Sequence, residues 1–303
     1  MLRTIKIYCF LYILFTNSIS NAATHPRVTV SLNPFYSLVT SIMGQSETVS
    51  LLVKPGFSPH DYSLKPSEVK QLYSSDIVVW GTPQLEGFLT PFFRNLPKKT
   101  TLIQLDKAPN LKTLLLRSKN CFHHAHHSLS GEHPIDPHFW LDTDNALALI
   151  DYITTELTKH TPAFAKLYLH NATELKLKIQ QLKTQLTTQL APVTNKPFLV
   201  MHDGYQYFEK EFSLKNMGTL VNEPEAPVSA QQLRVVHNII KKNNIQCIFS
   251  EPQFPAKIIT TIIEDLKIRA GILDPLGAKY VASPDAYFSL MQDLGNAFVE
   301  CLP

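Results

Sequence analysis

Three histidines stand in separate segments where their imidazoles could bind a metal ion. His60 lies in Lys-Pro-Gly-Phe-Ser-Pro-His-Asp-Tyr, His138 in Asp-Pro-His-Phe-Trp, and His202 in Val-Met-His-Asp-Gly. Three imidazoles and one further group form a tetrahedral zinc set. A lone loop histidine is more often solvated or hydrogen-bonded to a neighbour, so the spacing alone is a weak indication of a site.

Asp274 is the candidate for the fourth group. It ends a short apolar run and is followed by Pro275, Leu276 and Gly277. A carboxylate at this position could bind the metal or orient a ligand histidine. Aspartate also caps turns well. Both interpretations remain open at this level.

A histidine-rich segment forms a second feature that could bind metal. Five histidines fall within residues 123–133, with serine, glycine and proline among their neighbours. Such tracts bind metal ions through many weak, exchanging contacts. The alternative is a solvated polar loop with no metal function.

The segments around these residues predict two parallel sheets. Residues 27–140 alternate short apolar runs with helical patterns, which favours a parallel sheet covered on both faces. Residues 197–303 repeat this style. In open sheets of this class, ligands bind beyond the carboxyl ends of the strands. Strands are predicted at 28–32, 49–53, 76–80, 100–105, 198–201, 246–249 and 271–274, and helices at 34–43, 66–73, 205–212, 229–242, 255–267 and 284–301.

Residues 143–190 have a different pattern and predict a link between two domains. They contain no glycine and one proline, Pro162, and leucine recurs at helical spacing. This predicts one long helix, or two nearly collinear helices with Pro162 at the start of the second. An unbroken helix of this length would run roughly 70 Å, which is enough to join two domains. The predicted division is a signal peptide over 1–22, an N-terminal α/β lobe over 23–142 with a histidine-rich loop at 122–133, a long linking helix over 143–190, and a C-terminal α/β lobe over 191–303.

The N-terminus predicts export. Arg3 and Lys6 precede nine residues without charge, and Ser20-Asn21-Ala22 then offers small residues for cleavage. This is the plan of a secretory signal peptide, and the apolar run is too short to span a bilayer. A buried N-terminal strand is the alternative.

Cysteine usage fits an oxidising compartment. Cleavage would remove Cys9 and leave Cys121, Cys247 and Cys301, which allows one disulfide and one free thiol. The cysteine positions alone do not decide the pairing.

Bulk composition indicates a globular protein without a nucleic-acid partner. Hydrophobic residues make up 44% of the 303 residues and charged residues 17%, which is a globular balance. The net charge of +3 falls to about +1 once Arg3 and Lys6 are removed, and nothing in that value points to nucleic acid.

Five motifs in a fixed order carry a family resemblance over nearly the whole mature chain. The chain resembles the metal-specific solute-binding proteins of ABC importers, and most closely their zinc-uptake branch. The histidine-rich loop falls where zinc members carry theirs, and Cys247 and Cys301 match a disulfide of that branch. The motifs are Pro-His-Asp-Tyr-Ser-Leu-Lys-Pro-Ser from residue 59, His-Phe-Trp-Leu from 138, His-Asp-Gly-Tyr-Gln-Tyr-Phe-Glu from 202, Glu-Pro-Gln-Phe from 251 and Leu-Asp-Pro-Leu-Gly from 273.

The resemblance implies a two-lobed α/β fold with zinc in the cleft between lobes joined by a single long rigid helix. It implies ligation by His60, His138 and His202, and the manganese branch typically has a glutamate where His202 stands, so the imidazole favours zinc. Some zinc members place a glutamate before the first histidine, where this chain has Pro59. The fourth position is therefore left to Asp274 or to water.

The expected function is that of a periplasmic protein, not an enzyme, that captures Zn²⁺ and delivers it to the membrane permease of an ABC transporter. We expect a monomer without stable membrane insertion. Three alternatives remain: a manganese or iron carrier of the same fold, a zinc-dependent hydrolase, and a surface adhesin. The hydrolase is disfavoured because the chain has no His-Glu-x-x-His or Gly-x-Ser-x-Gly motif and no phosphate-binding loop.

Overall fold

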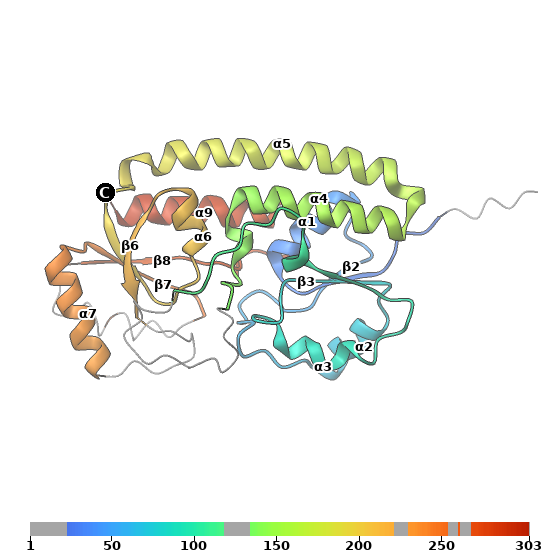
Figure 1. Ribbon diagram of the computed structural model, residues 1–303, viewed down its shortest axis with the longest axis horizontal. Helices are drawn as coiled ribbons and strands as arrows, with labels where there is room; N and C mark the ends of the chain where they lie inside the picture. The colour runs from blue at the N-terminus through green and yellow to red at the C-terminus, as the bar shows by residue number, and fades with distance from the viewer. Residues whose placement is uncertain (1–22, 118–133, 221–229, 254–259, 261–267, 303) are drawn as a thin grey trace, which may run out of the picture.

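The computed structural model describes residues 23–117, 134–220, 230–253, 260 and 268–302 (Figure 1). The expected signal peptide at 1–22, the histidine-rich loop at 122–133 and nearly all of the expected helix at 255–267 lie outside these residues. Within the described part of the chain, no helix combines the length and the apolar character needed to cross a membrane.

The first lobe is built on a four-stranded parallel sheet in the order β2-β1-β3-β4. Its central strands β1 and β3 are buried at every position, as expected where helices cover both faces. Helix α1 has Pro34 in its first turn and ends at Gly44, whose φ of +70° favours glycine. The elements are β1 (Val28–Val30), α1 (Asn33–Met43), β2 (Val49–Leu51), α2 (Pro66–Tyr73), β3 (Ile77–Trp80), α3 (Thr90–Phe93) and β4 (Thr101–Gln104).

The second lobe repeats this plan with a parallel sheet in the order β6-β5-β7-β8. Strand β6 was not predicted, because Lys-Asn-Met-Gly-Thr has no apolar run and lies at the edge of the sheet, where exposure is tolerated. Strand β8 begins two residues earlier than expected. The elements are β5 (Pro197–Val200), α6 (Gln206–Glu211), β6 (Lys215–Thr219), α7 (Ala230–Asn243), β7 (Cys247–Ser250), β8 (Arg269–Ile272) and α9 (Ala286–Cys301).

The prediction of an unbroken or nearly collinear helix over 143–190 is wrong. The chain forms α4 (Thr143–His160) and α5 (Ala165–Leu190), separated by a 3₁₀ turn that starts at Pro162. Lys176 of α5 pairs with Asp151 of α4, and seven residues further along α5, Lys183 pairs with Asp144, seven residues back along α4. The two helices are therefore antiparallel neighbours (Figure 1).

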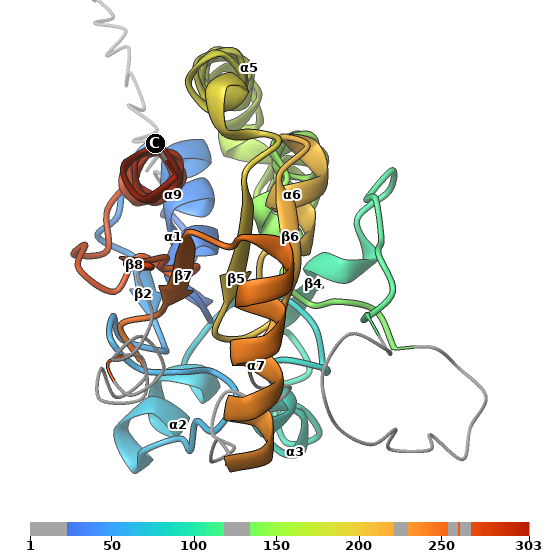
Figure 2. The same cartoon turned by 90° about the vertical axis from the view of Figure 1, so that its left-hand side faces the viewer.

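Helix α5 is the single long helix that joins the lobes. It packs against α1 and α4 at one end and against α9 at the other, and its 26 residues span about 39 Å. Helices α1, α4, α5 and α9 lie together on one side of the molecule, with α2 and α3 on the opposite side (Figure 2). The expectation of two parallel-sheet lobes linked by one long helix is confirmed, and α5 is that helix.

Buried polar groups tie the two lobes together directly. The Trp140 indole N–H donates to the carbonyl of Pro275 at 2.8 Å, and the Tyr287 hydroxyl donates to the carbonyl of Trp140 at 2.8 Å.

Cys247 and Cys301 form a disulfide within the second lobe, with a Cα separation of 5.8 Å. This pairing agrees with the resemblance and attaches the end of α9 to β7.

Candidate metal centre

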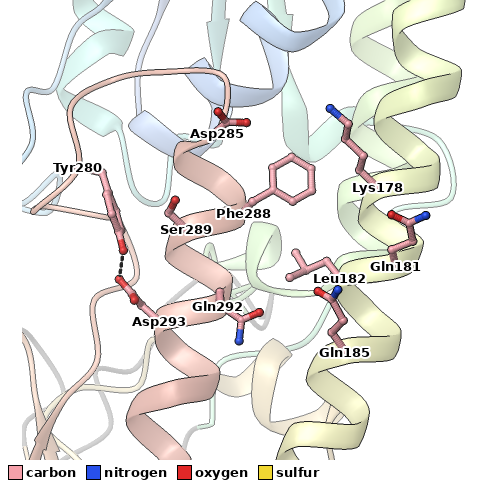
Figure 3. A pocket seen from close by; sticks show the side chains of 10 residues that line it. All are labelled: Lys178, Gln181, Leu182, Gln185, Tyr280, Asp285, Phe288, Ser289, Gln292 and Asp293. Atoms are coloured by element: carbon pink, nitrogen blue, oxygen red, sulfur yellow. Dashed lines mark hydrogen bonds between the residues drawn. The ribbon is translucent and has the colours of Figure 1, made fainter.

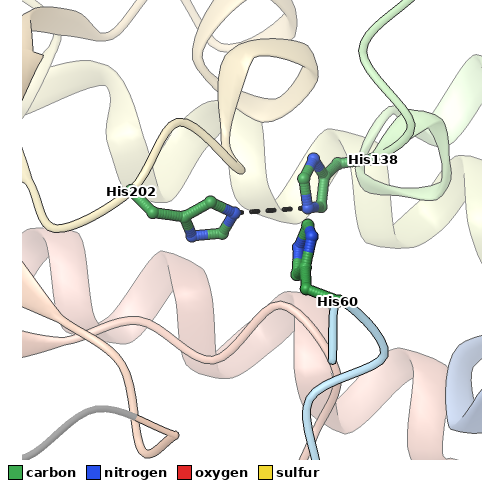
Figure 4. A group of neighbouring side chains, drawn as sticks. All are labelled: His60, His138 and His202. Atoms are coloured by element: carbon green, nitrogen blue, oxygen red, sulfur yellow. Dashed lines mark hydrogen bonds between the residues drawn. The ribbon is translucent and has the colours of Figure 1, made fainter. Parts of the chain in front are cut away.

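The structure brings the three predicted histidines together (Figure 4). His60 comes from the loop between β2 and α2, His138 directly precedes the 3₁₀ turn Phe139–Leu141, and His202 follows β5 by two residues. One ring nitrogen from each lies within 4.8 Å of those of the other two. His138 and His202 are 4% and 3% exposed, and His60 is half-buried.

The spacing of the imidazoles fits a tetrahedral metal ion. The Nε2 atoms of His138 and His202 are 3.4 Å apart. With Zn–N bonds of 2.0–2.1 Å, two ligands of a tetrahedral zinc ion lie about 3.3–3.4 Å apart. A hydrogen bond between two ring nitrogens would be long at this distance. The pair is thus better placed to share a cation than a proton.

Two buried carboxylates fix the orientation of these imidazoles. The Nδ1–H of His138 donates to Oδ1 of Asp136 at 2.9 Å, and Nδ1–H of His202 donates to Oε1 of Glu251. Both histidines therefore direct an Nε2 lone pair toward the site, an arrangement that also raises the basicity of a metal ligand. The charges of Asp136 and Glu251 offset a dication without supplying a ligand atom.

Neither carboxylate was assigned a role from the sequence, although a signal for each exists. Asp136 precedes His138 by two residues in Asp-Pro-His. Val200 of β5 pairs with Phe249 of β7. His202 and Glu251 each stand two residues beyond that pair, so the alignment of the two strands places them side by side. Knowing that these strands are neighbours would have revealed the contact.

The surroundings lower the pKa of His60 and raise the pKa of His202. Burial, together with nearby His138 and His202, lowers the pKa of His60 to about 2. Burial also acts to lower the pKa of His202, but the adjacent Glu251 carboxylate outweighs it and the pKa is raised. At neutral pH His60 thus offers an unprotonated nitrogen to a cation.

Asp274 is not brought into the histidine group. Its carboxylate accepts hydrogen bonds from the backbone N–H groups of Leu276, Gly277 and Ala278, at 3.1 and 2.9 Å for the first two. Burial raises the pKa of Asp274, and these hydrogen bonds oppose that effect. The side chain thus caps a turn, and Asp274 is not among the residues whose ligand atoms lie within 4.8 Å of one another at the histidine group.

A second acidic cluster of Asp142, Asp144 and Glu211 also has its oxygens within 4.8 Å of one another. Its negative charge is largely offset, because Lys112 and Lys183 both pair with Asp144 at 2.6 Å and each also pairs with one of the other two carboxylates. Asp142 and Glu211 also accept hydrogen bonds from the backbone at the start of α4. The cluster is a structural junction at the N-terminus of that helix.

A separate hollow of about 490 Å³ lies between α5 and α9 (Figure 3). Its lining holds no histidine or cysteine, and Tyr280 and Asp293 are hydrogen-bonded to each other within it. The hollow has no metal-binding character comparable to that of the histidine group. Its lining residues are Lys178, Gln181, Leu182, Gln185, Tyr280, Asp285, Phe288, Ser289, Gln292 and Asp293.

Comparison with known proteins connects this chain to zinc uptake. A family model described as zinc-uptake complex component A, periplasmic, matches residues 28–301. The high-affinity zinc uptake system protein ZnuA of Brucella abortus is 33% identical, with 94% of each chain covered. The protein of the same name from Yersinia pestis is 30% identical, with 91% of each chain covered. A crystal structure of ZnuA shares the fold with a TM-score of 0.79 at 24% identity, over 92% of this chain and 100% of that one.

Proposed function

The chain belongs to the family of periplasmic zinc-uptake complex component A proteins, and from this premise we propose how it takes part in zinc uptake. It is the periplasmic zinc-binding component of a zinc uptake system. The ion is cargo that is captured and released unchanged. Members of this family are solute-binding proteins, and we infer no catalytic step.

The ligands we propose are His60, His138 and His202. The observation that carries this proposal is the 3.4 Å separation of two Nε2 atoms whose opposite ring nitrogens are engaged by carboxylates. We propose that water completes the tetrahedron, because Asp274 is not among the residues whose ligand atoms lie within 4.8 Å of one another and its carboxylate is held by backbone N–H groups. Asp136 and Glu251 both accept from imidazoles, so neither is placed as a free general base for that water.

Delivery to the membrane permease of an ABC transporter follows from the family role. We propose that residues 1–22 direct export to the periplasm and that the protein acts as a monomer. In this view, residues 23–142 and 191–303 form the two lobes, and α5 limits their relative motion. A helix cannot bend at one residue without losing backbone hydrogen bonds, so release of zinc involves only small changes of the cleft.

The proposal is tested by competitive zinc titration against a chromogenic chelator. The wild type should bind one zinc ion tightly, and His60→Ala, His138→Ala and His202→Ala should each weaken binding sharply. His170→Ala on the exposed face of α5 is the matched control. Unchanged affinity in one of the three variants would remove that histidine from the ligand set. Manganese that displaces zinc at equal concentration would instead indicate a manganese carrier.

A further inference from the structure

Two short segments on either side of residues 118–133 form what we call the stalk, residues 114–116 and 134–136. They pair as antiparallel chains: Leu116 N–H donates to Pro134 O at 2.9 Å, and Asp136 N–H donates to Leu114 O at 2.8 Å. The second segment leads directly into His138. The stalk thus contains the carboxylate that orients one of the proposed ligands.

Helix α6 of the second lobe holds this stalk. The Tyr207 hydroxyl accepts from Leu114 N–H at 2.9 Å and donates to Asp136 O at 3.1 Å. The Gln206 amide nitrogen Nε2 donates to Leu115 O and to Asp136 Oδ2, both at 3.0 Å. The backbone and the carboxylate of the stalk are therefore bound from the opposite lobe.

A salt bridge beside the stalk strengthens the same contact. The guanidinium of Arg117 binds the carboxylates of Asp203 and Glu209, the latter at 2.8 Å. Asp203 directly follows His202. Burial raises the pKa of Glu209 to about 7, and Arg117 opposes this shift. The contact between α6 and the stalk therefore lies against the segments of two proposed ligands.

The two oxygens of Asp136 divide their partners between the lobes. Oδ1 accepts from the imidazole and the backbone N–H of His138, whereas Oδ2 accepts from Gln206. If the Gln206 amide is lost, the carboxylate keeps only the hydrogen bonds at Oδ1, both of them from His138. It can then rotate away from the orientation that points His138 at the site.

We propose that Gln206 is a positioning residue of the zinc site, which fixes from the second lobe the carboxylate that orients His138. His138 and His202 then face each other at zinc-binding distance only while α6 and the stalk are in contact. The inference rests on the proposed function. It adds that retention of zinc depends on the docking of the two lobes at this point, through a residue that touches no metal.

The expected effect can be scaled from known metal sites. Removing a direct hydrogen-bond partner of a metal ligand typically costs 10–100-fold in affinity. Gln206 acts one hydrogen bond further out, so Gln206→Met should raise the zinc dissociation rate by roughly tenfold, the low end of that range. Gln206→Glu should raise it further, because its carboxylate would face the acceptor oxygens of Asp136 and Leu115.

The experiment measures zinc release into excess chelator by stopped flow, together with the absorption spectrum of the Co²⁺-loaded protein. Gln185→Met on the exposed face of α5 is the control for loss of a glutamine. We expect faster release and an altered cobalt spectrum in the Gln206 variants, in addition to any fall of the unfolding midpoint of the zinc-free protein that the loss of two hydrogen bonds causes. A midpoint that falls while release and spectrum stay at wild-type values would assign Gln206 a purely structural role and overturn the proposal.

An exchange of donor and acceptor provides a second test. In Asp136→Asn combined with Gln206→Glu, the asparagine oxygen can still accept from His138, and its amide can donate to the new carboxylate. The double variant should therefore release zinc more slowly than the product of the two single effects predicts. Strict additivity would refute the contact. If wild type and the histidine variants all fail to bind zinc tightly, the proposed function fails instead.

Discussion

Replacing Glu251 by glutamine should weaken zinc binding and also make the remaining affinity less sensitive to acidification. Glu251 is buried and accepts from the Nδ1–H of His202. The glutamine side-chain oxygen can still accept this hydrogen bond, so the substitution removes a charge and keeps the shape. A negative charge behind the imidazole stabilises both a zinc ion and a proton on Nε2.

The size of the affinity loss follows from the charges. A dication and a carboxylate roughly 6 Å apart across the imidazole ring attract by about 5.5 kcal/mol at an effective dielectric constant of 20, and by about 1.4 kcal/mol in water. Loss of a carboxylate behind a ligand histidine costs 10–100-fold, or about 1.4–2.7 kcal/mol. The Coulomb energies and the affinity losses overlap at the values expected for charges screened by water. We therefore expect Glu251→Gln to weaken zinc binding roughly 10- to 100-fold near pH 8.

The pH dependence follows from the raised pKa of His202. Protonated imidazole cannot bind zinc, so the affinity of the wild type falls as pH drops through that raised pKa. Without the charge of Glu251, burial is opposed only by the charges of Asp203 and Asp136, so the pKa of His202 falls and proton competition begins at lower pH. The variant should bind less tightly near pH 8 but lose less of its affinity between about pH 8 and pH 6.

Competitive titration at several pH values, with Glu174→Gln on the exposed face of α5 as the control, checks both effects. The reasoning is refuted if affinity near pH 8 is unchanged, or if wild type and variant lose affinity in parallel on acidification.

Three further predictions concern the loop, the disulfide and Asp274. Deleting residues 122–133 should leave the tight zinc site intact, remove weaker additional zinc equivalents and slow loading when zinc is scarce; loss of the tight site in a calorimetric titration would give the loop a primary ligand. Replacing Cys247 and Cys301 by alanine should lower the free energy of unfolding by about 4 kcal/mol in the chain-entropy model, because the bridge spans a sequence separation of 54; urea unfolding with an unchanged midpoint would contradict this. Asp274→Asn should destabilise the fold by about 1 kcal/mol while leaving zinc affinity within about twofold; a tenfold loss of affinity would make Asp274 a ligand.

The positions of the histidines alone were a weak indication of a site, and the family motifs around them selected His60, His138 and His202. His60 and His202 follow apolar runs that form strands, and His138 begins a motif just before a helical pattern. The alternation of strands and helices also reflects short-range periodicity, so it predicted both parallel sheets. A break at Pro162 was one of the two predicted alternatives, because proline is tolerated in the first turn of a helix but disrupts a helix interior.

The direction of the chain after Pro162 could not be read from the sequence. A proline turn allows the following helix to continue or to reverse, and local preferences do not distinguish these outcomes. The antiparallel pairing is stabilised by contacts between residues far apart in sequence, such as Lys183 with Asp144. Edge strand β6 was not predicted because its own composition has no strand pattern and its conformation depends on pairing with β5.

The sequence by itself determined the chemistry of this protein: which side chains can bind zinc, that they stand in separate loops, and that two parallel sheets carry those loops. Only the tertiary structure decided the geometry. The carboxylate behind His202 comes from a neighbouring strand, the amide behind Asp136 comes from the opposite lobe, and Asp274 is used by a local turn. Ligand types follow from residue identity, whereas the orientation of an imidazole follows from hydrogen bonds that form only when distant segments pack together.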